Sequence, residues 1–428
     1  MIKRLIMTLL SLLFAVSAVG CGGNENNNRK PSEYRPLIRE DLMWDTESFF
    51  SRSVTVTDGE GEYQNKNGET KAIFFDGELY RGKMTTVFAY YGVPSSPMPE
   101  GGYPAVVLVH GGGGCAFYEW VEYWNGKGYV AIAPDFYGQQ YGSFSLQNGK
   151  APKNPNGGPS DSGSFGSTAE TCKDSWTYHS VANIMLAHNI LLADDRVNGE
   201  KIGLTGISWG SVLTLIASGV DYRFGAFAPV YGSGFLLDTP GVVGKSYYTP
   251  PADSAEWMRY YDPVSYLPYN NRPTLFSVGT NESFFSPLLQ QNLSELCKGD
   301  VYYGYRWELT HYHRWKDEEG MLNVASFFDR VLCGKEQPFL VSSERLNDRT
   351  LTIKMKGAEN VKQIRLCYTD AVGETSLQWV WNYTMLDIAF DGDTLTAEIP
   401  QSAALAFVEF SDMAFNEFFA SSSLYRFV

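Results

Sequence analysis

The chain has 428 residues, of which 44% are hydrophobic and 19% charged, and its formal net charge is −14 at pH 7. This length and composition are typical of a globular protein with one large core and a smaller companion domain. A negative charge without any cluster of Lys or Arg excludes nucleic acid as an expected partner, because nucleic-acid binding depends on neutralising phosphates.

The first 21 residues have the layout of a secretory signal. Lys3 and Arg4 precede an uncharged apolar run from Leu5 to Val19, which is too short to span a bilayer comfortably. The end of the run overlaps AVGC, residues 18–21, which resembles a bacterial lipobox, whose chemistry attaches lipid to the cysteine. We therefore expect residues 1–21 to be a lipoprotein signal peptide with a lipidated Cys21. The alternative is an ordinary cleaved signal.

This interpretation predicts an exported protein in the cell envelope, on the periplasmic or cell-surface face, with the lipid anchor as its only contact with the membrane. Residues 22–50 follow the predicted signal. Their first part, GGNENNNRKPSEYRP, is polar, contains two prolines and has no periodicity. Such a stretch is typical of a flexible tether that leads into a folded domain.

Residues 51–340 offer short β-rich runs, turns and longer helical patterns in succession, which predicts a mostly parallel sheet covered on both faces. Residues 71–77 and 83–94 are aromatic and β-branched, and predict antiparallel hairpin strands at a sheet edge. Five near-continuous apolar runs predict strands buried on both faces. These runs are residues 104–110, 129–135, 202–207, 224–232 and 273–279.

A long helix is predicted over about residues 175–193, with His188 on its apolar stripe. We expect His188 to be hydrogen-bonded against the sheet rather than catalytic. Two stretches interrupt the regular pattern, residues 138–168 and 232–262, and either could form a lid or a wall of a substrate cleft. For the first of them, a solvated insertion without function is an equal alternative.

Residues 341–428 alternate apolar and polar residues in short runs, which predicts half-buried strands and a small β-sandwich domain. Its aromatic stretch QWVWNYTML, residues 378–386, could present rings to a sugar. Large apolar groups in two-residue alternation are more often core, so we favour the core interpretation.

The segment IGLTGISWGSVLTLIASG carries the strongest chemical signal, because Gly-x-Ser-x-Gly follows a buried strand and precedes a helical pattern. A serine on such a sharp turn brings neighbouring backbone very close, so Gly206 and Gly210 must be small. Ser208 is therefore a candidate nucleophile. The helix that follows begins at Trp209, whose N–H is a candidate donor to an oxyanion.

A nucleophilic serine needs a base, and the chain has five histidines. The chain order of this fold, serine then acid then histidine, leaves His311 and His313 in ELTHYHRW. Glu282 follows the predicted strand 273–279 and is the candidate acid, with Asp262 as a reserve that looks more like a turn residue. A metal site at the two histidines is disfavoured, because no nearby Asp, Glu or Cys has ligand spacing.

The strand 104–110 runs into four glycines, Gly111 to Gly114, whose amides no side chain obstructs. Beside the serine turn, these amides are candidate oxyanion donors. A phosphate-binding loop would require Lys and Ser or Thr after the glycines, whereas CAFYEW follows them.

Together these motifs resemble the α/β-hydrolase superfamily, and within it the branch of acetylxylan esterases and dienelactone hydrolases. The resemblance covers about residues 70–335 and includes LVHGGGGCAF, AIAPDFYG, VNGEKIGLTGISWGSVLT, DYRFGAFAPVYGSG, RPTLFSVGTNE and THYHRW. It implies an α/β-hydrolase fold, and no metal or organic cofactor. The roles that it implies are nucleophile for Ser208, base for His311, acid for Glu282, and oxyanion donors for Gly112, Gly113 and Trp209.

The sequence departs from this branch at three positions. Relatives usually have Asp where Glu282 stands, which bears on the geometry of the acid. They usually have Gly where Ser211 stands and often Gly where Tyr312 stands, and both changes bear on packing. The C-terminal β-sandwich resembles the last domain of some exported members.

The expected function is an exported serine esterase that removes acetyl or similar acyl groups from polysaccharides or oligosaccharides such as xylan. Its expected partner is a small-molecule or oligosaccharide ester. One alternative is a serine peptidase like the prolyl-oligopeptidase relatives, although the chain lacks the length for their β-propeller. The other alternative is a glycan-binding surface lipoprotein whose hydrolase domain is a degenerate remnant.

Overall fold

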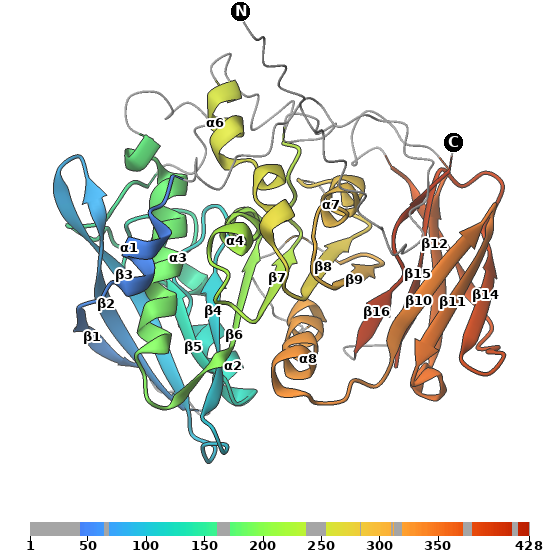
Figure 1. Ribbon diagram of the computed structural model, residues 1–428, viewed down its shortest axis with the longest axis horizontal. Helices are drawn as coiled ribbons and strands as arrows, with labels where there is room; N and C mark the ends of the chain where they lie inside the picture. Colours follow the sequence, from blue (N-terminus) through green and yellow to red (C-terminus); the bar gives the residue numbers. More distant parts are fainter. Residues whose placement is uncertain are drawn as a thin grey trace, which may run out of the picture. The chain divides into compact units, whose positions relative to one another are not determined.

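A nine-stranded sheet organises the first part of the chain, in the order β1-β2-β3-β5-β4-β6-β7-β8-β9 (Figure 1). Its strands are β1 Val56–Tyr63, β2 Gly68–Tyr80, β3 Lys83–Pro94, β4 Tyr103–Val109, β5 Val130–Pro134, β6 Val197–Ile207, β7 Ala226–Val230, β8 Thr274–Gly279 and β9 Val301–Arg306. Strands β1, β2 and β3 pair antiparallel, β3 pairs antiparallel with β5, and β4 to β9 are parallel. The predicted α/β-hydrolase fold, with a mostly parallel sheet and an antiparallel hairpin at its edge, is confirmed.

The computed structural model describes residues 43–63, 68–160, 172–236, 254–282, 284–309, 311, 319–370, 379–412 and 418–427. All of these belong to one compact unit, which begins at Pro31. The predicted signal peptide, Cys21 and most of the predicted tether lie outside the described residues. In the described part of the chain, no helix is both long enough and apolar enough to cross a membrane.

Helices cover both faces of this sheet, as predicted. They are α1 Thr46–Ser51, α2 Tyr118–Gly126, α3 Trp176–Leu192, α4 Trp209–Val220, α6 Ser254–Tyr261, α7 Pro287–Ser294 and α8 Glu319–Cys333. Strand β4 shows why helices are needed on both faces of the sheet. Its side chains Ala105, Val107 and Val109 pack in the core that contains α3 and α4. Val106 and Leu108 pack in the core that contains α2 and α8. Alternate side chains of a strand point to opposite faces, so an apolar run must be buried on both.

Helix α3 matches the predicted helix closely, and the side chain of Ser175 caps its N-terminus by accepting from the N–H of Tyr178. His188 on this helix is fully buried, and its Nδ1 lies 3.0 Å from Oδ2 of Asp221. Its ring also stacks on Phe224. His188 therefore packs and hydrogen-bonds within the core, as expected from the sequence.

Two antiparallel sheets follow, ordered β10-β11-β14 and β13-β12-β15-β16, with β17 paired to β15. Their strands are β10 Leu340–Asn347, β11 Thr350–Lys356, β12 Gln363–Thr369, β13 Trp381–Leu386, β14 Thr394–Glu398, β15 Leu405–Ser411, β16 Phe419–Ser421 and β17 Tyr425–Arg426. Side chains of both sheets share one core, so the predicted β-sandwich is observed. The boundary after residue 340 stays a prediction, although β10 begins at Leu340.

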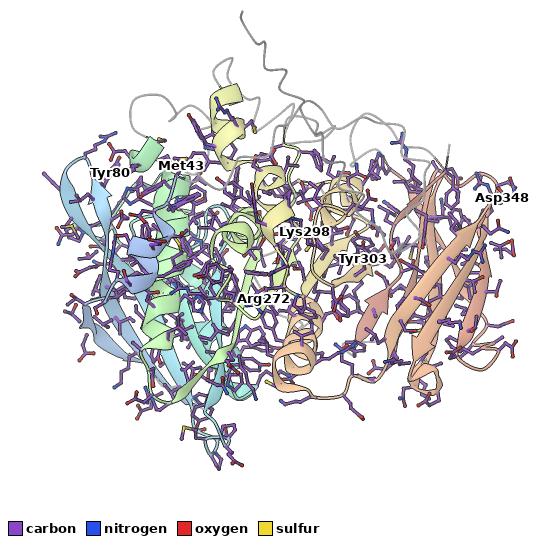
Figure 2. The ribbon with its side chains drawn as sticks, in the orientation of Figure 1. Met43, Tyr80, Arg272, Lys298, Tyr303 and Asp348 are labelled. Atoms are coloured by element: carbon purple, nitrogen blue, oxygen red, sulfur yellow. The ribbon has the colours of Figure 1, made fainter. Side chains whose placement is uncertain are left out.

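Strand β15 differs from the half-buried strands that were expected, because all of its residues are buried. Ala406, Val408 and Phe410 pack in the sandwich core, whereas Phe407 belongs to the same core as Tyr305 of β9. Tyr303, which Figure 2 labels on β9, bonds to Ser294 on α7. The five-stranded sheet thus has one face in the sandwich and the other against the hydrolase sheet.

The aromatic stretch 378–386 is only partly core. Trp379 is 6% exposed, whereas Tyr383 is 48% and Met385 47% exposed. These two residues lie on β13, the edge strand of its sheet, where neither face is fully covered. The core interpretation is therefore wrong for the second half of the stretch.

Candidate active site

The turn at Ser208 joins β6 to α4 in a strained backbone conformation, with φ 54° and ψ −123°. A positive φ is costly for a residue with a side chain, and it persists only where the surroundings enforce it. Here a Cβ at Gly206 would lie 2.3 Å from the carbonyl oxygen of Gly210, and one at Gly210 would lie 2.2 Å from that of Val109. Both glycines are therefore sterically required, as the sequence analysis argued.

His311 lies between Ser208 and Glu282. Its Nε2 is 2.9 Å from Oγ of Ser208, and its Nδ1 is 2.9 and 3.0 Å from the two carboxylate oxygens of Glu282. Because a carboxylate only accepts hydrogen bonds, Nδ1 carries the proton and Nε2 accepts from the serine hydroxyl. The structure thus brings together all three side chains that the sequence analysis selected.

Glu282 is held firmly in its position. It is 1% exposed, and its Oε1 accepts the N–H of Phe284 at 2.6 Å and that of Phe285 at 3.2 Å. Amide donors satisfy the buried carboxylate and fix its direction toward the imidazole. The longer side chain of Glu, where relatives have Asp, therefore reaches the histidine without losing its backbone anchors.

Aromatic rings enclose the imidazole of His311. Its ring centroid is 4.5 Å from that of Tyr231 and 4.6 Å from that of Phe284. Tyr231 directly follows β7 and itself has a positive φ of 38°. These aromatic residues carry no motif in the sequence, because their contacts with His311 depend on the approach of three separate loops.

The sequence offered two further candidates, Asp262 as a reserve acid and His313 as an alternative base. Asp262 accepts the N–H groups of Phe235, Leu236 and Val264, so it organises a turn, as its place in the sequence suggested. His313 lies outside the described residues, and the structure does not test it.

The glycine segment after β4 lies against the serine turn. A Cβ at Gly112 would lie 2.9 Å from Cδ1 of Trp209, and Gly113 has a φ of 70°, which favours glycine. The carbonyl oxygen of Gly113 accepts the N–H of Asn148 at 2.7 Å. The first long excursion therefore contacts this segment at Asn148, which favours the wall interpretation over a solvated insertion.

Behind the glycines, polar groups fix the same segment. The Nε2 of His110 accepts the N–H of Phe136 at 3.0 Å, while its Nδ1 faces the carbonyl oxygen of Gly111 at 3.0 Å and must donate to it. The Nε2 of Gln139 donates to the carbonyl oxygen of Gly114 at 3.1 Å. His110 is therefore a neutral structural histidine in this arrangement, and the segment has side-chain anchors that the sequence motif did not reveal.

Asp135 organises the turn that carries Gln139. Its Oδ2 accepts the N–H of Tyr137 at 2.9 Å and that of Gln139 at 2.7 Å. Burial nevertheless raises the pKa of Asp135 to about 6, against the lowering effect of these amides. In the sequence, Asp135 belongs to the family-like stretch AIAPDFYG, but the motif alone did not predict its role in this turn.

Helix α6 of the second excursion contributes a wall. Its Trp257 is 2% exposed and meets the ring of Trp209 edge-on, with the centroids 6.3 Å apart. Residues 237–253 of this excursion lie outside the described residues. The described end of the excursion therefore contacts the serine turn, as the wall interpretation expected.

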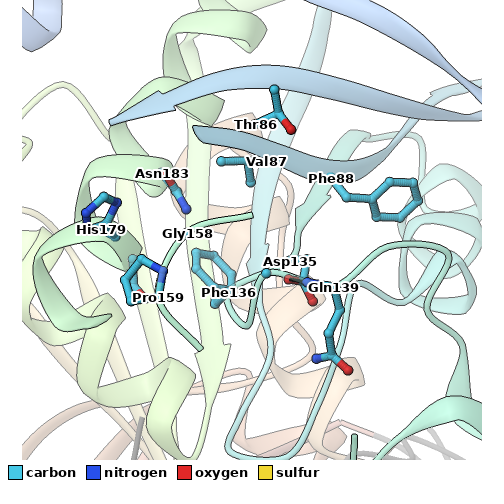
Figure 3. Close-up of a pocket in the computed structure, with 12 residues that line it drawn as sticks. Thr86, Val87, Phe88, Asp135, Phe136, Gln139, Gly158, Pro159, His179 and Asn183 are labelled. Atoms are coloured by element: carbon cyan, nitrogen blue, oxygen red, sulfur yellow. Dashed lines mark hydrogen bonds between the residues drawn. The ribbon is translucent and has the colours of Figure 1, made fainter. Parts of the chain in front are cut away.

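Two pockets in the described structure are separate from this site. The first, shown in Figure 3 beside Asp135 and His179, has an interior of about 10 Å³, which is room for about one water. The second is a groove of about 810 Å³ between α1 and the end of α3, with Arg52, Arg196 and Arg223 on its walls. Neither is lined by Ser208, His311 or Glu282.

A nucleophile turn after β6, an imidazole after β9 and a carboxylate after β8 define a serine hydrolase of the α/β-hydrolase fold. Residues 87–298 match the model of the dienelactone hydrolase family. This chain therefore carries a dienelactone hydrolase family domain, and the resemblance inferred from its motifs is confirmed.

Several solved structures are similar to part of this chain. The acetyl xylan esterase from Paenibacillus sp. R4 is 17% identical over 65% of this chain and 91% of that chain, with a TM-score of 0.49. Acetyl xylan esterase 1 from Thermoanaerobacterium sp. JW/SL YS485 is 15% identical over 66% and 93%, with a TM-score of 0.47. An acylaminoacyl peptidase from Pyrococcus horikoshii is 18% identical over 63% and 42%, with a TM-score of 0.45. At these values the likenesses carry no argument about substrate.

A comparison with curated proteins finds no match to this chain.

Proposed function

We propose that this protein is an exported esterase that hydrolyses acetyl or similarly small acyl esters on polysaccharides or oligosaccharides, through an acyl-enzyme on Ser208. The observation that carries the proposal is the position of His311, whose two ring nitrogens bond Ser208 on one side and Glu282 on the other. The family of the domain supports hydrolysis, and the arrangement of these groups supports the serine mechanism.

In the first half of the proposed reaction, Ser208 Oγ attacks the ester carbonyl while its proton passes to Nε2 of His311. The carboxylate of Glu282 stabilises the imidazolium that forms and holds the ring in the required tautomer. The amides of Gly112, Gly113 and Trp209 would donate to the oxyanion of the tetrahedral intermediate, and loss of one such donor typically slows acyl transfer about a hundred- to a thousandfold.

The imidazolium then protonates the departing alcohol oxygen, which leaves an acyl-serine. In the second half, His311 removes a proton from water, and the hydroxide attacks the acyl carbonyl. Collapse of this second intermediate returns the proton to Ser208 and releases the carboxylic acid.

A small acyl group is favoured by the aromatic walls of the site. Large rings lie around the serine turn and the imidazole, namely Trp209, Trp257, Tyr231, Phe284 and Phe285. The saccharide part of the proposal rests on the resemblance of the sequence motifs to acetylxylan esterases.

Export and lipid anchoring at Cys21 remain part of the proposal and are supported by the sequence alone. A degenerate, purely glycan-binding protein is disfavoured, because the Glu282 that motivated it reaches His311 within hydrogen-bond distance. Globomycin-sensitive processing or palmitate labelling that depends on Cys21 would support the anchor, and unchanged labelling in Cys21→Ala would contradict it.

The function is tested by measuring acetate release from acetylated xylan, its oligosaccharides and an aryl acetate. We expect turnover of all three, with the highest kcat/KM on a saccharide. Turnover of dipeptidyl reporters without any release of acetate would contradict the proposal and favour a peptidase.

A further inference from the structure

Residues 307–309, the described part of the segment between β9 and His311, include one unfavourable backbone conformation. Glu308, in the middle of this segment, has a φ of 54° although it carries a side chain. Such a conformation persists where neighbouring groups hold it in place. The position of His311 therefore depends on what anchors residues 307–309.

One anchor comes from the hydrolase sheet. Oγ1 of Thr280, directly after β8, accepts the N–H of Glu308 at 2.9 Å. A Cβ at Gly279 would lie 2.0 Å from the carbonyl oxygen of Leu309, so the segment lies directly on the end of β8. Since Glu282 follows two residues after Thr280, this contact couples the segment of the base to the loop of the acid.

The other anchor comes from the C-terminal sheets. Oε2 of Glu409 on β15 accepts the N–H of Trp307 at 2.6 Å, and Glu409 is 3% exposed. Its Oε1 accepts from Nη1 of Arg365 on β12 at 2.8 Å. A buried carboxylate that is paired with a guanidinium and bonded to an amide makes a strong, directional contact.

Further contacts support the same junction. The N–H of Tyr305 donates to Oγ of Ser421 at 2.9 Å, and β9 contacts β16. The indole of Trp307 meets the ring of Tyr383 edge-on, with the centroids 4.7 Å apart. The C-terminal sheets therefore contact both β9 and the first residue of the segment that leads to His311.

We infer that Glu409 is a positioning residue for His311, and that the C-terminal sheets are a working part of the esterase site rather than an attached binding module. This inference rests on the proposed function. Glu409 lies outside the motifs that carry Ser208, Glu282 and His311. It acts on His311 through the backbone of Trp307. Removal of its carboxylate frees this backbone, and a displacement of about 1 Å between base and nucleophile can cost about a hundredfold in rate.

A merely structural role of Glu409 would lower stability and leave the rate of the folded fraction unchanged. A positioning role lowers kcat while KM for a small substrate stays the same. A matched control is Glu344 on β10, a partly buried carboxylate of the C-terminal sheets that accepts the N–H of Ser423.

The test uses the full chain and compares Glu409→Ala, Glu409→Gln and Glu344→Gln. The readouts are the rate of fluorophosphonate labelling at Ser208, kcat and KM with an aryl acetate, and thermal unfolding. We expect Glu409→Ala to slow labelling and kcat about ten- to a hundredfold with KM within about twofold. Glu409→Gln keeps an oxygen that can accept the Trp307 N–H, so it should recover part of the rate. Glu344→Gln should keep kcat within about twofold.

Equal labelling rates in the parent and a folded Glu409→Ala would overturn the inference and leave the proposed function intact. If Glu409→Ala does not fold, Glu409→Leu takes its place, because it fills the space but accepts no hydrogen bond from Trp307. Labelling of a folded Glu409→Leu at the rate of the parent overturns the inference equally. A parent that is not labelled at Ser208 at all would overturn the proposed function together with the inference.

Discussion

Nε2 of His311 lies 2.9 Å from Oγ of Ser208, although 103 positions separate the two residues in the chain. The contact is possible because β6, β8 and β9 are parallel members of one sheet. Their carboxyl ends therefore meet at one edge, where the loops that carry Ser208, Glu282 and His311 converge. The sheet order, rather than any local motif, brings the base to the nucleophile.

The first prediction concerns this pair. Ser208→Ala removes the nucleophile, and His311→Ala removes its base, so we expect each to lower kcat by at least about a thousandfold. Because the two residues act as a unit, the double variant should be little worse than either single one. Esterase kinetics and fluorophosphonate labelling measure this. Multiplicative losses in the double variant would indicate that the two residues act independently.

The second prediction concerns Glu282. Glu282→Gln keeps the size of the side chain, but its amide removes the charge that stabilises the imidazolium, and we expect kcat to fall by about a thousandfold or more. Glu282→Asp keeps the charge on a shorter side chain, which cannot reach His311 and the amides of Phe284 and Phe285 at once. A smaller loss, about tenfold, is expected there.

These two substitutions also test whether Glu282 is the acid at all. Thermal unfolding of both variants serves as the control for global damage. Near-parental kcat in a folded Glu282→Gln would assign the acid role elsewhere, with Asp262 as the residue to examine next.

The sequence was sufficient to predict the fold and Ser208, because both depended on local signals, whereas His311 was selected over His313 through the family resemblance. The run from Ile202 to Ile207 is apolar enough to require burial on both faces, and the glycines at 206 and 210 require a sharp turn. The order of serine, acid and histidine then limited the base to two residues, and only one of these is described by the structure.

The supports of the site could not be predicted, because they depend on contacts between distant segments. The amide of Asn148 bonds the carbonyl of Gly113, and the carboxylate of Glu409 bonds the amide of Trp307. In the sequence Glu409 lies in a strand that looks half-buried, and its neighbours give no hint that its face packs on another sheet. Tertiary packing also left Tyr383 exposed at an edge, where alternation alone suggested core.

The third prediction concerns the turn at Ser208. In Gly210→Ala the new Cβ would lie 2.2 Å from the carbonyl oxygen of Val109, so backbone must shift. We expect a loss of about 1–3 kcal/mol in the free energy of unfolding, as for other overpacked sites, together with a lower kcat. Urea unfolding measures the first effect.

Gly199→Ala is the matched control, because its Cβ would meet only Cδ2 of Leu192, the flexible end of a side chain, at 3.0 Å. It should change the free energy of unfolding by no more than about 0.5 kcal/mol. Similar losses in the two variants would mean that close backbone approach at Gly210 is not the cause.

The last prediction concerns pH and the buried Asp135. Burial raises the pKa of this carboxyl from its ordinary value of 3.8 to about 6, so the folded state favours the protonated form. Its stabilising contribution is complete below about pH 4 and is lost as the pH rises through 6. A difference of about two pKa units corresponds to about 3 kcal/mol in the free energy of unfolding. In Asp135→Asn the group is neutral at every pH, so this fall should disappear.

The measurement is the free energy of unfolding from urea titrations between pH 4 and pH 7. Asp195→Asn, at an exposed carboxylate, should follow the same course as the parent. Other groups also make stability depend on pH, among them buried His188, whose pKa burial lowers, so the informative quantity is the difference between the variant and the parent. Parallel curves for Asp135→Asn and the parent would show that folding does not raise the pKa of Asp135, because a raised pKa makes the stability of the parent alone fall between pH 4 and pH 6.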